Sequence, residues 1–308
     1  MKITVLGSGA GLPSKTRNTQ SFIIDLIEEI NEYFLIDAGE ALQHRILNTN
    51  IKPSKITNIF ITHLHGDHIY GLPGFLSSRS HQGGEGVPLT IYGPKGLKYW
   101  LETSFEITSS HLNYPIEFVE VSHNDCFDIS GFTVSTFLLD HNIDSFLYVF
   151  EEPVKKGSLN VNKLLDIGVT PGPVLKTIKE STSFEHNGTT YLTEDFLGSP
   201  VDGRKISIHG DTRVICSEDY YQLINHSDVI VHEATYLTNE KEKAHQYFHS
   251  EIDDVLENFN NVSYGQLLIS HISNRYDEDD LKVIQDKLPS EVTLMYDLLD
   301  ITIPRDSR

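Results

Sequence analysis

A dense cluster of metal-ligand residue types follows one hydrophobic run of the sequence. Residues 62–68 read THLHGDH and offer three imidazoles and one carboxylate within six positions. Imidazole nitrogen and carboxylate oxygen suit zinc and related transition metals. His63 and His65 are two residues apart in extended chain, so their side chains point to the same side and could chelate one ion. Asp67 and His68 follow a glycine and could hold a second ion. A chance cluster among 15 histidines would explain neither the spacing nor the position at a strand end.

Three further residues of ligand type stand where other hydrophobic runs end. They are His141 after the run 132–139, Asp211 after the run 205–208 and His271 after the run 267–270. Open sheets collect their sites at the ends of their strands. Either histidine taken alone is better explained as an ordinary surface or core residue. The ordered set, placed after the cluster at 62–68, favours ligands of the same metal centre.

The elements that must position these residues alternate along most of the chain. Short β-branched and aromatic runs predict strands at 2–6, 21–25, 33–36, 56–62, 89–92, 116–121, 132–139, 146–150, 205–208, 229–232 and 267–270. Amphipathic runs predict helices at 39–47, 71–80, 97–107, 218–225, 250–258 and 279–287. Strands interleaved with helices in this way predict an α/β sandwich built from two similar halves.

Residues 151–202 interrupt that alternation. This stretch has clusters of Gly, Pro, Ser and Thr, including Pro171-Gly172-Pro173, and little clean periodicity. We interpret it as a flexible arm inserted into a single domain that spans residues 1–308.

The composition is that of a chain that folds, with 39% apolar and 22% charged residues. Two cysteines, Cys126 and Cys216, cannot form a disulfide framework, which favours a reducing, cytoplasmic location. The start MKITVLGSG lacks the features of a signal peptide, and no apolar run is long enough to cross a bilayer. We therefore expect no membrane partner.

The net charge is −20, from 24 basic and 44 acidic residues, and taken alone it argues against a nucleic-acid partner. Its distribution changes that reading. Residues 217–308 carry 19 acidic and 7 basic residues, whereas residues 151–180 carry 4 acidic and 5 basic residues. A less acidic face, which includes the first part of the arm, is therefore available to a phosphate backbone.

The pattern His-x-His-x-Asp-His at a strand end resembles the metallo-β-lactamase superfamily. The resemblance implies a four-layer αββα sandwich, the metallo-β-lactamase fold, with a two-metal site along one edge and here a protruding arm. The implied ligands are His63, His65 and His141 for one metal and Asp67, His68 and His271 for the other, with Asp211 bridging them.

Other motifs resemble the ribonuclease Z family, the endonucleases that mature tRNA 3′ ends. They are PSKTRN at 13–18, GLPGFLSSRS at 71–80, GDTR at 210–213, HEATY at 232–236 and SHISNRY at 270–276. The resemblance implies a zinc-dependent endoribonuclease that cuts precursor tRNA next to the discriminator base and leaves a 3′-hydroxyl on the tRNA. It also implies a homodimer with two Zn²⁺ ions per subunit, although manganese or iron would accept similar ligands.

The same resemblance suggests which residues meet the tRNA. They are Lys15, Arg17 and Asn18 of the N-terminal motif and Gly172 and Pro173 of the arm, which is similar to the tRNA-binding exosite of the family. A solvated basic turn and an ordinary loop are the simpler explanations of the two segments.

Two metals about 4 Å apart can activate a shared water and stabilise both the attacking and the leaving oxygen. Asp67 would then be a ligand and the proton acceptor that steers the nucleophile. His249 or Glu233 is the candidate donor of the proton that the leaving 3′ oxygen needs. Glu233 could instead orient a ligand, and His249 could be an exposed histidine near a helix start.

Two other functions remain open. The first is another hydrolase of the same fold that acts on a small ester, thioester or phosphodiester, although such a substrate needs neither the arm nor the basic N-terminal motif. The second is a catalytically silent RNA-binding or structural protein, against which the complete set of ligand candidates argues.

Overall fold

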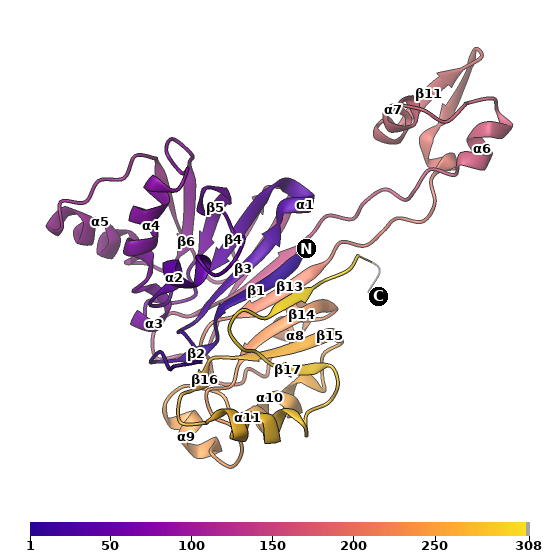
Figure 1. Ribbon diagram of the computed structural model, residues 1–308. Coiled ribbons are helices and arrows are strands. Elements are labelled where there is room, and N and C mark those ends of the chain that lie inside the picture. The colour runs from indigo at the N-terminus through magenta and orange to yellow at the C-terminus, as the bar shows by residue number, and fades with distance from the viewer. Residues whose placement is uncertain (306–308) are drawn as a thin grey trace. The chain divides into compact units, whose positions relative to one another are not determined.

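The computed structural model describes residues 1–305, which divide into two compact units. The first unit, called the body below, combines Met1–Glu151 with the chain from Lys205 onward. The second, called the arm unit, is Glu152–Arg204. It begins one residue later and ends two residues later than the insertion expected from the sequence. Figure 1 shows both units and labels many of their elements.

The body contains two seven-stranded mixed sheets. The first has the order β18-β1-β3-β4-β5-β6-β7, in which β4, β5, β6 and β7 are parallel and the remaining pairs are antiparallel. Its strands are β1 (Lys2–Gly7), β3 (Ser21–Leu26), β4 (Glu32–Ile36), β5 (Ile56–Phe60), β6 (Leu89–Gly93), β7 (Ile116–Glu120) and β18 (Asp300–Thr302).

The second sheet has the order β17-β15-β14-β13-β10-β9-β8, with β13, β14, β15 and β17 parallel and the other pairs antiparallel. Its strands are β8 (Cys126–Ile129), β9 (Phe132–Leu138), β10 (Phe146–Glu151), β13 (Lys205–His209), β14 (Ser227–Glu233), β15 (Tyr264–Ser270) and β17 (Val292–Leu294). A two-residue strand near the N-terminus, β2 (Gly9–Ala10), pairs in parallel with β16 (Ile272–Ser273).

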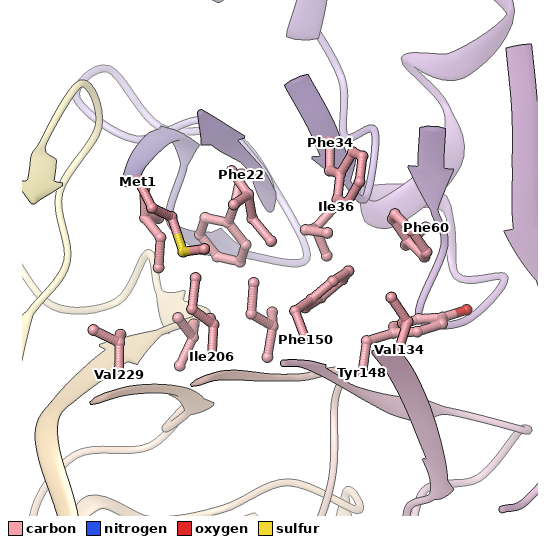
Figure 2. Close-up of a cluster of buried hydrophobic side chains, with 14 of the residues drawn as sticks. Met1, Phe22, Phe34, Ile36, Phe60, Val134, Tyr148, Phe150, Ile206 and Val229 are labelled. Atoms are coloured by element: carbon pink, nitrogen blue, oxygen red, sulfur yellow. The ribbon is translucent and has the colours of Figure 1, made fainter. Parts of the chain in front are cut away.

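The two sheets pack face to face through a core of large apolar side chains. Phe60 of β5 lies 5.0 Å from Phe150 and 5.4 Å from Tyr148 between ring centroids, and both of these residues belong to β10. Figure 2 shows the side chains of the two sheets pointing toward one another. Because successive strand residues face opposite sides, Ile59 points away from Phe60 into a different cluster.

Helices cover the outer face of each sheet, which completes four layers (Figure 1). The first sheet is covered by α2 (Leu42–Ile46), α4 (Leu72–His81) and α5 (Leu97–Ile107). The second is covered by α8 (Glu218–Ile224), α10 (Ile252–Phe259) and α11 (Glu278–Gln285). The shorter segments of the body are α1 (Ile27–Ile30), η1 (Pro53–Lys55), α3 (Gly66–Ile69) and α9 (Lys241–Gln246). The expected αββα sandwich is confirmed.

Several predicted boundaries were wrong for physical reasons. The helix expected over 39–47 begins only at Leu42, because Ala41 has a left-handed backbone with φ of 60°. The strand expected over 56–62 ends at Phe60. The backbone N–H of Thr62 instead donates to the side chain of Asp37, at 2.8 Å. The short strands β8, β17 and β18 were not predicted.

The arm unit is folded rather than irregular. It contains α6 (Val161–Asp166), α7 (Val174–Glu180), the hairpin of β11 (Ser183–His186) and β12 (Thr189–Leu192), and η2 (Thr193–Phe196). Its elements pack around a small core of Leu164, Val169, Ile178 and Phe196. No periodic signal revealed this core in the sequence, because each element contributes only one or two apolar residues.

Within residues 1–305, no helix is both long enough and apolar enough to span a membrane.

Candidate metal centre and active site

Four of the expected ligands converge at one end of the two sheets. His63 and His65 follow β5, His141 follows β9 and Asp211 follows β13. Nδ1 of His65 lies 3.1 Å from Nε2 of His63 and 3.2 Å from Nε2 of His141. Oδ2 of Asp211 lies 3.5 Å from Nε2 of His63. Loops from both sheets therefore deliver four potential ligand atoms to one point.

Asp67, His68 and His271 form a second group beside the first. Nε2 of His271 lies 3.3 Å from Nε2 of His68 and 3.2 Å from Oδ2 of Asp67. Asp211 reaches this group as well, with Oδ1 3.5 Å from Nε2 of His68 and Oδ2 3.3 Å from Nε2 of His271. The carboxylate of Asp211 thus touches both groups.

The spacing and chemistry of these atoms fit transition-metal ions. Ligand atoms of a tetrahedral zinc site with bonds of about 2.0–2.1 Å lie about 3.3–3.4 Å apart, and the contacts given above fall close to that value. Oδ1 of Asp211 is buried without a hydrogen-bond partner, which is rare for a carboxylate oxygen unless a cation is its partner. The nitrogen and oxygen donors suit zinc, and they also suit manganese or iron.

Four of the ligand imidazoles are oriented by a contact at Nδ1, the ring nitrogen that points away from the centre. Nδ1 of His68 lies 2.7 Å from Oδ2 of Asp37, and Nδ1 of His271 lies 2.8 Å from Oγ1 of Thr235. Nδ1 of His141 lies 2.9 Å from the carbonyl oxygen of Phe248, and Nδ1 of His63 lies 3.1 Å from Oγ1 of Thr62. Such contacts direct Nε2 of each ring inward, toward the point where the ligands meet.

Asp37 was not singled out as a site residue by the sequence analysis. Its side chain is fully buried, and it accepts hydrogen bonds from the backbone N–H and the hydroxyl of Thr62 besides contacting His68. Asp37 also has a left-handed backbone, with φ of 55°. The sequence did contain a signal for Asp37. This residue directly follows the apolar strand β4, just as the expected ligands directly follow other apolar strands.

Burial and charge act in opposite directions on these groups. Burial, aided by His68, lowers the pKa of His63 to about 4, so this imidazole stays neutral and able to bind a metal. Burial works against ionisation of Asp211, but His271, His68 and His63 outweigh it and hold the pKa of that carboxyl well below its usual range. Burial likewise opposes ionisation of Asp67, and its histidine neighbours lower its pKa. Both carboxylates are therefore ionised at neutral pH.

Buried Glu233 and half-buried His249 form a pair next to this centre. Oε1 of Glu233, at the end of β14, lies 2.9 Å from Nδ1 of His249. Nδ1 of His249 is also 3.9 Å from Oδ2 of Asp211. Burial disfavours protonation of His249, but Glu233 outweighs burial and raises the pKa of this imidazole to about 9. A pocket of about 480 Å³ opens beside His249, and Arg213 and Ser250 also line it.

The expected tRNA-binding residues differ in their accessibility. Lys15, Gly172 and Pro173 are exposed, and Asn18 is half-buried. Arg17 is only 7% exposed, and its guanidinium donates to Oγ of Ser8 at 2.7 Å and to a carbonyl oxygen. Arg17 therefore faces the interior of the body, and its expected contact with tRNA stays a prediction.

Comparison with known proteins places this geometry in a family. Residues 1–154 match the family model described as Anti-Pycsar protein Apyc1, over the half of the chain that holds the HLHGDH cluster. A protein named Ribonuclease Z from Staphylococcus epidermidis is 46% identical over 293 residues, which cover 95% of this chain and 95% of that protein. The chain belongs to the ribonuclease Z family.

Solved structures agree with that membership. The crystal structure of human tRNase Z, short form, matches with a TM-score of 0.71 and 27% identity, over 99% of this chain and 100% of that one. The metallo-β-lactamase fold protein YhfI from Bacillus subtilis matches with a TM-score of 0.66 over 97% of this chain and 98% of that one. At 14% identity, the second match shows the fold alone. The family, the fold and the enzyme class of metal-dependent endoribonuclease that the motifs predicted are confirmed.

The role of Asp37 can be tested by replacing its carboxylate with an amide. In Asp37→Asn, His68 loses the anion that orients its ring, so we expect zinc affinity to fall by about 10- to 100-fold. Competition with a chromophoric chelator measures this affinity. Asp125→Asn is a matched control, because Asp125 also accepts from a nearby backbone N–H but contacts no ligand. Equal zinc affinity in the two variants would show that Asp37 does not support the metal centre.

Proposed function

We propose that this ribonuclease Z family member is a zinc-dependent endoribonuclease that cleaves precursor tRNA next to the discriminator base. The product would be a tRNA with a 3′-hydroxyl. One observation carries the proposal: seven ligand residues meet in two groups that share Asp211, in a chain 46% identical to a ribonuclease Z.

These residues offer binding sites for two metal ions. We assign His63, His65 and His141 to one zinc ion and Asp67, His68 and His271 to the other, with Asp211 between them. Zinc bound there would supply a nucleophilic water at neutral pH and would neutralise charge on the phosphodiester. The neutral state of His63 and the ionised state of Asp211 are the protonation states that such binding needs.

Asp67 is suited to orient the attacking water. Its side chain is 11% exposed, and Oδ2 accepts a hydrogen bond from the backbone N–H of Gly11 at 2.7 Å. Because its pKa is lowered, Asp67 remains an ionised hydrogen-bond acceptor at neutral pH. We therefore assign it the role of aligning the water, and the family resemblance adds the role of proton acceptor.

His249 is suited to protonate the leaving 3′ oxygen. It faces a pocket, and its pairing with Glu233 keeps the imidazole protonated at neutral pH. Glu233 also accepts hydrogen bonds from the backbone N–H groups of Thr212, Thr235 and Ser250, so its carboxylate is held in place. We assign the proton transfer to His249 and the orientation of that imidazole to Glu233.

The exposed residues of the two recognition segments support a tRNA substrate. Lys15 at the N-terminal motif is exposed, as are Gly172 and Pro173 before α7. In the arm unit Lys176 is exposed, and its ammonium lies 3.9 Å from the carboxylate of Glu180. These positions offer positive charge and open backbone to phosphates. The same family resemblance supports a homodimer, and the two free, exposed cysteines agree with a reducing cytoplasm.

Incubation of the purified protein with a precursor tRNA tests the proposal most directly. We expect a single cut next to the discriminator base, which a chelator abolishes and added zinc restores. Asp67→Ala should reduce cleavage by about 10²-fold or more, because the water loses its orienting group, without a change in the unfolding transition. Denaturing gel electrophoresis locates the cut. Cleavage that survives the chelator would exclude a metal-dependent reaction, and a fully active Asp67→Ala would remove Asp67 from the mechanism.

Substrates with different leaving groups can test whether His249 donates the proton to the leaving oxygen. The 3′ alkoxide of a tRNA needs a proton to leave, whereas p-nitrophenolate leaves readily without one. We therefore expect His249→Ala to lower kcat on precursor tRNA by about 10²-fold or more, with a much smaller effect on bis(p-nitrophenyl) phosphate. Initial rates at saturating substrate measure both values. An equal loss on the two substrates would instead assign His249 to water activation or metal support.

Deletion of the arm unit separates tRNA processing from hydrolysis of small substrates. Glu151 and Lys205 are cross-strand partners of the antiparallel pair β10–β13, so an Asn-Gly turn can replace Glu152–Arg204 and keep the sheet intact. We expect this variant to lose precursor tRNA cleavage by about 10²-fold or more and to keep activity on bis(p-nitrophenyl) phosphate. Unchanged tRNA cleavage would refute the exosite. A wild-type enzyme that hydrolyses only the small ester would favour the alternative small-substrate hydrolase.

A further inference from the structure

The segment of residues 8–18, called the N-terminal loop below, reaches into the metal centre. The backbone N–H of Gly11 donates to Oδ2 of Asp67 at 2.7 Å. Gly11 has φ of +67°, and a Cβ at this position would meet no atom within 4 Å. The left-handed backbone, rather than close packing, is therefore what calls for glycine. The loop sets one of the hydrogen bonds that orient Asp67.

The same loop is attached to the second metal-ligand segment. Gly9 and Ala10 pair in parallel with Ile272 and Ser273, and the backbone N–H of Ile272 donates to the carbonyl oxygen of Ser8 at 3.0 Å. His271 immediately precedes this pair and has a left-handed backbone, with φ of 53°. A displacement of the loop would therefore move the neighbours of Asp67 and of His271 together.

Asp297 holds the loop at both of its ends. Oδ1 accepts hydrogen bonds from the backbone N–H and the hydroxyl of Ser8, at 3.0 and 2.9 Å. Oδ2 accepts from the backbone N–H of Asn18 at 2.7 Å and forms an ion pair with Nη2 of Arg45 at 2.9 Å. The side chain of Asp297 is only 3% exposed, so these bonds have little competition from water. Both oxygens are fully used, and neither contacts a metal ligand.

Arg17 supports the same attachment from inside the loop. Its Nη1 donates to Oγ of Ser8 at 2.7 Å and to the carbonyl oxygen of Met295, two residues before Asp297. The loop is therefore closed onto the segment Met295–Asp297, while Lys15 at its tip stays exposed. This arrangement explains why a basic residue of the N-terminal motif is buried.

We propose that Asp297 is a positioning residue of the reaction, which fixes the N-terminal loop so that Gly11 orients the carboxylate of Asp67. The proposal rests on the proposed function of the metal centre and adds a residue to it. Asp297 acts through the backbone of the loop and touches neither substrate nor metal ligand. Its effect therefore belongs to the chemical step, and it should appear with any phosphodiester, whether or not the substrate is a tRNA.

The test compares Asp297→Asn with Asp300→Asn. An asparagine at 297 must turn its NH₂ group toward the N–H of either Ser8 or Asn18, so one end of the loop is released. Asp300 is the matched control, because it also ties the C-terminal segment to an N-terminal one, through the Thr4 hydroxyl and Lys2, but contacts no loop residue. The measurements are kcat and KM for bis(p-nitrophenyl) phosphate and precursor tRNA, zinc per chain and the unfolding transition.

We expect Asp297→Asn to lower kcat on both substrates by about 10- to 100-fold, since a displacement of about 1 Å at a reacting group can have that effect. Zinc per chain and KM for the small ester should stay within about twofold of wild type, and Asp300→Asn should match wild type. Equal kcat in the two variants would overturn the proposal. So would a loss confined to KM for tRNA, or one that follows the zinc content.

If Asp297→Asn does not fold, a second pair of variants tests whether the N-terminal loop orients Asp67. Asparagine tolerates a left-handed backbone and valine does not, so Gly11→Val should have a kcat on the small ester about tenfold or more below that of Gly11→Asn. Equal rates in both Gly11 variants would overturn the role of the loop. A wild-type protein that fails to cut tRNA would reject the proposed substrate alone, because the small ester still reports on Asp297.

Discussion

The central constraint on this structure is the burial of Asp211 as an ionised carboxylate. An isolated charge in a protein interior is strongly unfavourable, so it must be matched by positive charge or by hydrogen-bond donors. The side chain of Asp211 is only 2% exposed, and its nearest neighbours are the imidazoles of His63, His68 and His271, which come from two different segments of the chain. One of its oxygens has no hydrogen-bond partner. The centre is therefore arranged for cations.

The two sheets are needed because neither can supply both ligand groups alone. His63, His65, Asp67 and His68 follow a strand of the first sheet, whereas His141, Asp211 and His271 follow strands of the second. The apolar core fixes the relative position of the sheets, since Phe60 of β5 packs on Phe150 of β10 across the space between the two sheets. The packing energy of large aromatic residues thus determines distances among polar atoms that those residues do not touch.

The seven residues that the sequence proposed as ligands lie together in the structure, and they could be found because their signal is local. Each stands just beyond an apolar run, and strand ends in open sheets meet along one edge. The supporting residues gave weaker signals. Asp37 also follows a strand. Nothing in the sequence, however, distinguishes an aspartate that orients His68 from an aspartate that is exposed to solvent. Asp297 pairs with Ser8 and Asn18, more than 270 positions away, so its role depends entirely on tertiary structure.

The predicted helix and strand boundaries were wrong where the backbone near the site makes hydrogen bonds or adopts conformations that regular helices and strands do not have. The strand expected to reach Thr62 stops at Phe60, because the N–H of Thr62 bonds the side chain of Asp37. Similarly, Ala41 and His271 adopt left-handed conformations that a propensity argument for ordinary L-residues disfavours. Deviations of this kind gather at functional sites, because tertiary contacts there outweigh local preference.

The acidity of the chain follows from the same architecture. The arm unit carries 7 acidic and 6 basic residues, so nearly all of the net −20 belongs to the body. Part of that excess is internal: Asp37, Asp67, Asp211 and Glu233 are buried or nearly so around the metal centre. Two divalent ions would bring four positive charges against these four carboxylates. The charge that a phosphodiester would meet at the centre would thus be set by bound metals and a protonated His249, and a formal count from the sequence contains neither.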